Sequence, residues 1–232
     1  MIAARVVAVR ERISRAAARA GRAATDVTLV AVSKTHPPDS VREAVAAGLR
    51  EFGENKVQEA EGKLAALQDL GLTWHLVGHL QGNKARRAAA LFDVIHSVDS
   101  AELGRRLSRA ALELQRELRV LVQVNVANES GKSGLSESDL LPVLEALRPL
   151  PALRVEGLMT LPPETDDPER ARPWFARLRA LRDGALRQGL LQGAHLSMGM
   201  SHDLDAAVAE GATLVRVGTA IFGAREAPAS FS

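Results

Sequence analysis

The sequence alternates eight times between a short apolar run and a longer stretch with helical periodicity. The runs that we expect to form strands lie at residues 27–32, 49–52, 73–77, 94–97, 120–126, 153–159, 194–198 and 213–217. Strands that alternate with helices form parallel sheets, and eight such units in 232 residues are typical of a (β/α)8 TIM barrel. A doubly wound open sheet is the alternative, but no G-x-G-x-x-G motif follows the first strand. We therefore predict an α/β fold of one barrel, with a single domain over residues 1–232.

The stretches between the strands carry local signals for helix boundaries. Asp39 is expected to begin the first helix, and Asp99 with Glu102 predicts a capping box for the fourth. Asp167 and Pro168 are expected to open the sixth. The predicted helices span residues 39–47, 56–70, 83–91, 99–114, 136–147, 167–188 and 202–210.

The first 22 residues are rich in arginine and alanine and contain a single acid, Glu11, as a transit peptide would. Apolar residues nevertheless recur here at helical spacing, at Ile2, Val6, Val9, Ile13 and Ala17. We therefore expect an extra N-terminal helix that covers the bottom or the side of the first strand.

Composition narrows the classes of function. The chain has no cysteine, which excludes disulfides and thiolate metal sites and fits a cytoplasmic protein. The formal net charge is +2, only 3% of residues are aromatic and the arginines are spread along the chain, so we expect no nucleic-acid surface. No apolar stretch approaches the roughly 20 residues that a membrane span needs. The histidines show no pattern of metal ligands, so no metal site is expected.

A lysine closes the first predicted strand. Lys34 follows a run that reads as buried on both faces, and burying an ammonium group is costly unless something compensates. In a parallel barrel, the carboxyl end of a strand is where active sites open. Lys34 is therefore either a surface lysine whose ammonium group reaches water or an amine kept for chemistry.

Glycine and hydroxyl residues follow the last two predicted strands. Ser201 comes after residues 194–198, and Gly218 with Thr219 comes after residues 213–217. Each feature alone fits an ordinary helix cap or turn. Together they lie in the two loops that commonly bind phosphate in such barrels, where hydroxyls and backbone N–H groups can donate to an anion.

Arg216 interrupts the apolar run of the last strand. It is either an ion-pair partner of a neighbouring acid or a fixed cation at the mouth of the barrel. A lysine, a phosphate cradle and a rigid arginine at one mouth describe a pyridoxal phosphate (PLP) site, with the arginine facing the ring nitrogen. The glycine-rich loop at residues 128–134 lacks the P-loop spacing, so Walker-type binding is not expected.

Six blocks in order carry a family resemblance: AVSKTHPP at 31–38, FGENKVQE at 52–59, WHLVGHLQGNK at 74–84, NESGKSG at 128–134, GLMTLP at 157–162 and LSMGMSHDLDAAVAEGATLVRVGTAIFG at 196–223. The chain resembles the pyridoxal phosphate homeostasis proteins, single-barrel relatives of the alanine racemase N-terminal domain. The resemblance implies a Schiff base between PLP and Lys34, and a phosphate surrounded by Ser201, Gly218 and Thr219. It also implies Arg216 near the pyridine nitrogen and Asn55 beside the ring. It implies no role for His79.

The resemblance implies a protein that binds PLP, takes part in intracellular PLP (vitamin B6) homeostasis and amino-acid balance, and either buffers PLP or delivers it to PLP-dependent apoenzymes. We expect a monomer without turnover of its own and hence without catalytic residues. The alternative is a PLP-dependent amino-acid racemase. Alanine racemases of this barrel type use a tyrosine base from a second domain, and this chain contains neither a tyrosine nor a recognisable second domain. An arginine at the ring nitrogen also opposes its protonation, which makes the ring a poorer electron sink.

Overall fold

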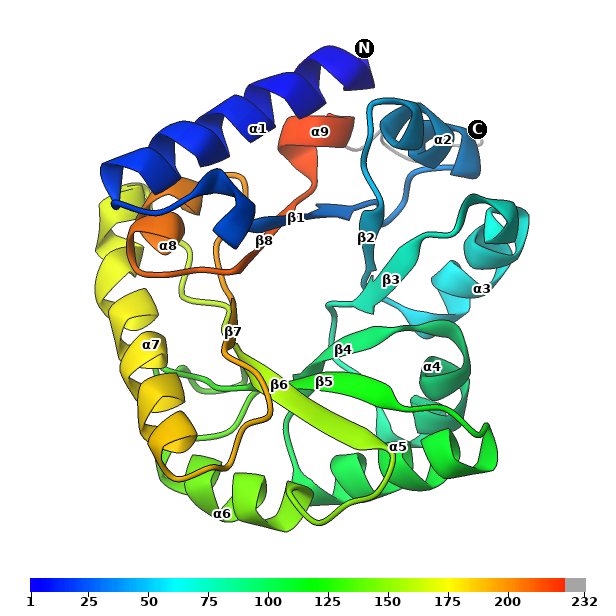
Figure 1. The fold of residues 1–232 in the computed structure, drawn as a ribbon, viewed down its shortest axis with the longest axis vertical. Helices are drawn as coiled ribbons and strands as arrows, with labels where there is room; N and C mark the ends of the chain where they lie inside the picture. Colours follow the sequence, from blue (N-terminus) through cyan, green and yellow to red (C-terminus); the bar gives the residue numbers. More distant parts are fainter. Residues whose placement is uncertain (224–232) are drawn as a thin grey trace, which may run out of the picture.

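The computed structural model describes residues 1–223 and contains a closed barrel of parallel strands surrounded by helices (Figure 1). The strands are β1 Thr28–Val32, β2 Glu51–Glu54, β3 Thr73–Leu76, β4 Val94–Val98, β5 Leu118–Gln123, β6 Leu153–Met159, β7 His195–Ser197 and β8 Leu214–Val217. Each strand pairs with the next one along the chain, and β8 pairs with β1. This closure confirms the predicted (β/α)8 barrel and excludes the doubly wound sheet. The predicted domain of residues 1–232 includes residues 224–232, which lie outside the described part of the chain.

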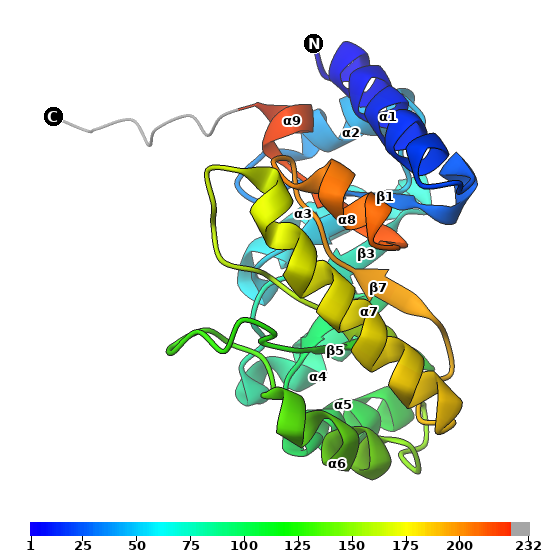
Figure 2. The same ribbon diagram turned by 90° about the vertical axis from the view of Figure 1, so that its left-hand side faces the viewer.

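Helices lie around the outside of the barrel (Figures 1 and 2). They are α1 Ile2–Arg19, α2 Pro38–Ala46, α3 Val57–Ala66, α4 Ala85–Leu91, α5 Ala101–Glu113, α6 Glu137–Leu147, α7 Arg172–Arg187, α8 Leu204–Ala209 and α9 Thr219–Phe222. The apolar stripe of α1 is buried, which confirms the N-terminal helix. This helix packs against α2, α8 and α9, beside the place where β1 meets β8 (Figure 1).

Three helices begin at other residues than the prediction gave. Helix α2 begins at Pro38, one residue before Asp39, since the fixed φ of proline suits the first helical position. Ser100, and not Asp99, caps α5, and its side chain accepts a hydrogen bond from Leu103 N–H at 3.2 Å. The predicted helix at 202–210 begins only at Leu204, after Asp203.

Other predicted boundaries are wrong by a few residues. Strand β2 continues through Gly53 and Glu54, which were expected in a turn, and β5 ends at Gln123 rather than at residue 126. Three predicted helices, 56–70, 83–91 and 167–188, contain short 3-10 segments at Gln68–Leu70, Gly82–Lys84 and Pro168–Ala171. These tighter turns share the helical spacing of apolar residues, so the sequence pattern does not separate them from α-helix.

Apolar side chains form two clusters on the two faces of the sheet. The larger cluster fills the space between the strands and the helices. The smaller one consists of Val30, Leu121, Met159 and Leu214, whose strand positions alternate with those of the larger cluster, and it lies inside the barrel. Much of the rest of the interior is polar, with buried His75, His96, Ser197 and Arg216 on four different strands.

Candidate functional site

Lys34 lies in the turn directly after β1, and its neighbours on both sides are fixed by β2 and α3. The Ser33 hydroxyl donates to Glu54 Oε1 at 2.6 Å. Thr35, whose φ is +67°, donates its backbone N–H to Glu59 Oε1 at 2.5 Å. The half-buried Lys34 amine makes no hydrogen bond or ion pair with any residue of the described range 1–223. The backbone at Lys34 is therefore held while its amine stays available.

A buried ion pair between Lys63 and Glu54 stabilises the turn that carries Lys34. Lys63 Nζ lies 2.6 Å from Glu54 Oε1 and donates to the Ser33 carbonyl at 2.7 Å. Burial raises the pKa of Glu54, and the hydrogen bonds from Lys63 and Ser33 oppose that shift. Sequence reasoning missed this pair because it placed Glu54 in a turn, whereas Glu54 is the last residue of β2. The signal available was that Lys63, nine residues after Glu54, lies on the helix that follows β2.

The structure brings together the hydroxyl residues of the last two loops. Thr219 Oγ1 donates to Ser201 Oγ at 3.2 Å, and Ala220 N–H donates to the same oxygen at 3.4 Å. A Cβ atom at Gly218 would lie 3.2 Å from the Val32 carbonyl oxygen, so this loop passes close to the end of β1. Ser201 does not cap α8, because Asp203 takes the position before that helix and accepts from Met200 N–H at 2.6 Å.

Helix α1 anchors the loop that carries Ser201. Arg12 donates to the carbonyl oxygens of Ser201 and His202 at 2.6 Å and 3.2 Å. Its Nε also donates to Asp205 Oδ2 at 2.5 Å. The apolar spacing of α1 predicted the helix but gave no sign of this contact, since Arg12 is one of several arginines on its polar side.

Arg216 is 4% exposed and makes its bonds to neutral acceptors. Its Nη2 donates to the Thr160 carbonyl at 2.8 Å, and its Nη1 donates to Ser197 Oγ. Burial lowers the pKa of Arg216 to about 10, and the negative charge of Asp203 opposes this shift. The guanidinium is thus still charged at neutral pH. No acid within residues 1–223 lies within ion-pair distance of it, so the predicted alternative of a neighbouring acid partner does not hold there.

Asn55 directly follows β2 and is half-buried. A Cβ atom at Gly78 would lie 2.3 Å from the Asn55 carbonyl oxygen, so the segments after β2 and β3 approach closely. The predicted site residues therefore follow or end β7, β8, β1 and β2, four neighbouring strands of the barrel. In addition, His36 after β1 stacks on Phe222 of α9, with ring centroids 5.0 Å apart.

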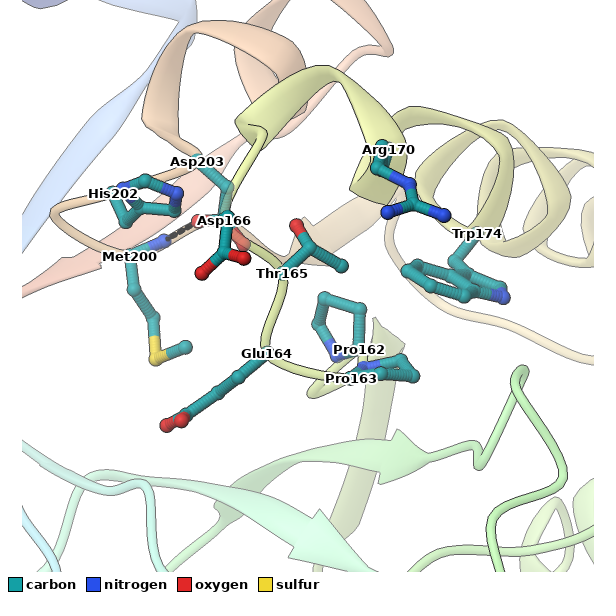
Figure 3. Close-up of a pocket in the computed structure, with 10 residues that line it drawn as sticks. All are labelled: Pro162, Pro163, Glu164, Thr165, Asp166, Arg170, Trp174, Met200, His202 and Asp203. Atoms are coloured by element: carbon teal, nitrogen blue, oxygen red, sulfur yellow. Dashed lines mark hydrogen bonds between the residues drawn. The ribbon is translucent and has the colours of Figure 1, made fainter.

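A cavity of about 880 Å³ opens beside Ser201, between the loops that follow β6 and β7 (Figure 3). In Figure 3, Met200 and His202 lie at the left, Glu164 and Asp166 lie on the loop at the centre, and Trp174 lies at the right. On the opposite side of the mouth, His79 Nδ1 lies 3.4 Å from Asp99 Oδ2 in a second hollow of about 470 Å³. Burial raises the pKa of Asp99, and His79 opposes that shift. The space at the mouth thus extends beyond the predicted site residues on both sides.

Two further findings bear on the class of protein. No cluster of three or more His, Asp or Glu side chains within the described residues could hold a metal ion. None of the helices in that part of the chain is long and apolar enough to cross a membrane.

Comparisons with known proteins identify the family. A family model described as the N-terminal domain of alanine racemase matches residues 5–226. The pyridoxal phosphate homeostasis protein of Pseudomonas aeruginosa is 50% identical over 231 residues, which cover 99% of each chain. This chain belongs to the pyridoxal phosphate homeostasis protein family. The predicted family is thereby confirmed.

A solved member of this family is similar over nearly its whole length. The structure of PipY from Synechococcus elongatus with PLP bound has a TM-score of 0.85 and 43% identity, and the match covers 96% of this chain and 100% of that one. The structure of PipY without PLP has a TM-score of 0.88 and 44% identity, with the same coverage. The family therefore includes a protein that binds PLP within this fold.

Proposed function

We propose that this protein binds PLP at the carboxyl ends of β7, β8, β1 and β2, supplies it to PLP-dependent apoenzymes, and turns over no amino acid. One observation carries the proposal. A lysine amine without a partner in the described residues, a hydroxyl pair and a buried cation follow or end the three neighbouring strands β7, β8 and β1. PLP presents three groups that match them: an aldehyde, a phosphate and a ring nitrogen.

The two hydroxyl-bearing loops fit the phosphate group. Ser201 and Thr219 place two oxygens 3.2 Å apart, each able to turn its O–H toward an anion. Gly218 leaves the backbone N–H groups of this loop uncovered by a Cβ atom. Several neutral donors of this kind can stabilise a dianion without a cation in contact with it.

Lys34 fits the aldehyde. When bound, PLP supplies an electrophilic aldehyde carbon, which can be transferred from one amine to another. Lys34 would hold this carbon through its amine, which has no partner among the described residues. Arg216 suits the ring nitrogen, because its fixed charge opposes a proton there and its remaining N–H groups can donate. Asn55 is the polar side chain that follows the neighbouring strand, and we assign it a place beside the ring.

Borohydride reduction tests the assignment of Lys34. Reduction of the PLP-loaded protein and peptide mapping should find the pyridoxyl group on Lys34, because this amine is anchored through its backbone at the end of β1. The matched control is Lys56→Ala, which removes an exposed lysine after β2 and should leave the label unchanged. Label on another lysine in the wild-type protein would refute the assignment.

Turnover assays separate the proposed carrier from the racemase alternative. Racemisation needs an acid–base group on each face of the reacting carbon, and this chain contains no tyrosine to serve the second face. We expect no turnover of L-alanine, L-serine or L-glutamate by chiral chromatography and keto-acid assay. Rates on the order of 1 to 1,000 per second would overturn the proposal. Loss of such turnover in His79→Ala would then identify the base, since His79 and Asp99 form a pair at the mouth.

A further inference from the structure

A continuous row of hydrogen bonds crosses the inside of the barrel. At the amino end of β2, Glu51 Oε2 lies 2.6 Å from His75 Nε2. His75 Nδ1 lies 2.8 Å from His96 Nε2, and His96 Nδ1 lies 2.8 Å from Ser197 Oγ. Ser197 Oγ in turn accepts from Arg216 Nη1. Five residues from five strands thus connect the bottom of the barrel with the proposed cofactor site.

The two residues at the ends of this row have fixed roles: Arg216 can only donate and an ionised Glu51 can only accept. A guanidinium has donors and no acceptor, so Ser197 Oγ accepts from Arg216. An ionised carboxylate accepts only, so His75 Nε2 must carry the proton toward Glu51. His75 Nδ1 is then an acceptor for His96 Nε2–H, and His96 Nδ1 is an acceptor for the Ser197 hydroxyl. Every proton in the row therefore points from Arg216 toward Glu51, with both rings neutral.

The opposite direction leaves a buried proton without an acceptor. If His96 carried its proton on Nδ1, it would donate to Ser197 Oγ, which already accepts from Arg216. The Ser197 hydroxyl hydrogen would then need a third partner, and the described residues offer none. An unsatisfied buried donor costs more than a typical hydrogen bond contributes. The carboxylate of Glu51 consequently determines the direction of a hydrogen bond at the far end of the barrel.

The surroundings of His96 agree with a neutral ring. His96 is fully buried, and burial together with His75, Arg216, His195 and Arg119 holds the pKa of His96 well below its ordinary value. Partial burial of Glu51 opposes its ionisation, but the hydrogen bonds from the His75 ring and the Thr73 side chain, together with the charge of Arg119, bring the pKa of Glu51 below its ordinary value. A row in which every hydrogen bond has the same direction requires an ionised Glu51 and a neutral His96, and both pKa shifts favour these states.

We infer that Glu51, His75, His96 and Ser197 are positioning residues that hold the Arg216 guanidinium in one orientation, with its free N–H groups directed at the cofactor ring. The last step rests on the proposed function, whereas the direction of the row does not. Ser97, the residue next to His96, provides an internal comparison. Its hydroxyl is equally buried but has no hydrogen-bond partner among the described residues, so it is outside the row.

Nitrogen-15 NMR of the cofactor-free protein tests the direction. Long-range proton–nitrogen correlation spectra distinguish the two neutral tautomers of histidine, and both His75 and His96 should carry their proton on Nε2. Glu51→Gln should weaken this preference, because an amide can donate as well as accept. A wild-type His96 that carries its proton on Nδ1 would overturn the inferred row.

Paired serine variants test the effect on the cofactor. Ser197→Ala should weaken PLP binding roughly five- to tenfold. It should also make the absorbance of bound PLP depend on pH in the neutral range, because a displaced guanidinium no longer opposes protonation of the ring. Ser97→Ala should change neither property, and Ser197→Thr, which keeps the hydroxyl, should restore both. Identical behaviour of Ser197→Ala and Ser97→Ala would refute the positioning role. Failure of the wild-type protein to bind PLP would instead refute the proposed function and leave the NMR result to decide the direction.

Discussion

Lys34 and Lys63 have the same side chain, but their surroundings give the two amines different hydrogen-bond partners. Lys63 is 7% exposed, and its amine is occupied by Glu54 and by the Ser33 carbonyl. The amine of Lys34 has no partner within residues 1–223, although the backbone around it is fixed. Lys63 therefore contributes to the stability of the turn, and Lys34 is the amine that remains for chemistry. Breaking a buried ion pair at one partner is strongly destabilising, so the two lysines are not interchangeable.

The buried histidine of β4 predicts a dependence of stability on pH. The pKa of His96 is depressed in the folded protein, so below its ordinary pKa of about 6.5 the unfolded chain binds a proton that the folded chain excludes. Stability that is present above about pH 6.5 should fall by up to ~1.4 kcal/mol per pH unit as the pH drops toward the folded-state pKa. Urea unfolding at several pH values measures this slope.

The matched variants are His96→Gln and His202→Gln. His96→Gln should lower stability above about pH 6.5 but flatten the slope below it, since the excluded proton is gone. His202 is exposed, and its replacement should leave the slope unchanged. A wild-type slope retained in His96→Gln would mean that other groups cause it.

At the scale of elements, α1 acts as a support for the proposed phosphate loop as well as a cover for the barrel. Its apolar stripe packs into the core while Arg12, on another side, binds two carbonyl oxygens of the loop after β7. The same guanidinium pairs with Asp205 at the start of α8. Loop and helix are thereby fixed relative to each other by one side chain.

Arg12→Ala should weaken PLP binding by about tenfold, because the loop that carries Ser201 loses its anchor. Binding of pyridoxal, which has no phosphate, should change much less. Arg15→Ala is the control on the same helix, since Arg15 only reaches Glu11 at 3.7 Å and both side chains are exposed. Calorimetric titration measures both ligands. Equal losses in the two variants would show that the anchor has no specific effect.

The candidate site could be proposed from the sequence where it depends on strand ends. Lys34 and Arg216 are polar residues at the end of or inside apolar runs, and the barrel rule brings such positions to one mouth. The row through His96 and Ser197 was not predictable, because these residues are 101 positions apart and meet only through strand order and register. The cap of α5 was not predictable for a different reason. Asp99 and Ser100 are adjacent and both residue types are favoured at the N-cap, so the sequence does not distinguish between them.

For the whole molecule, the important feature is that the first and last strands are neighbours. Val30 is in register with Arg216, and Ala31 with Val217. The proposed covalent link to PLP therefore comes from one side of this closure, and most of the proposed phosphate contacts come from the other. The two contributions can be removed separately.

Removing each contribution in turn should show that the phosphate controls retention. Lys34→Ala should still bind PLP without a covalent link, because the donors of Ser201, Gly218 and Thr219 remain. Wild-type protein should bind pyridoxal far more weakly than PLP. Equilibrium dialysis of both ligands against both proteins measures this. Equal affinity of the wild type for pyridoxal and PLP would contradict the proposed phosphate site.

Closure between β1 and β8 also has a consequence for synthesis of the chain. A ribosome produces Lys34 before Arg216, Gly218 and Thr219, so a nascent chain that stops between them has no complete site. A ligand that binds only the finished barrel stabilises it by mass action and leaves partial chains unprotected. If PLP binds as proposed, proteases should cleave truncated or PLP-free molecules faster than the PLP-loaded barrel.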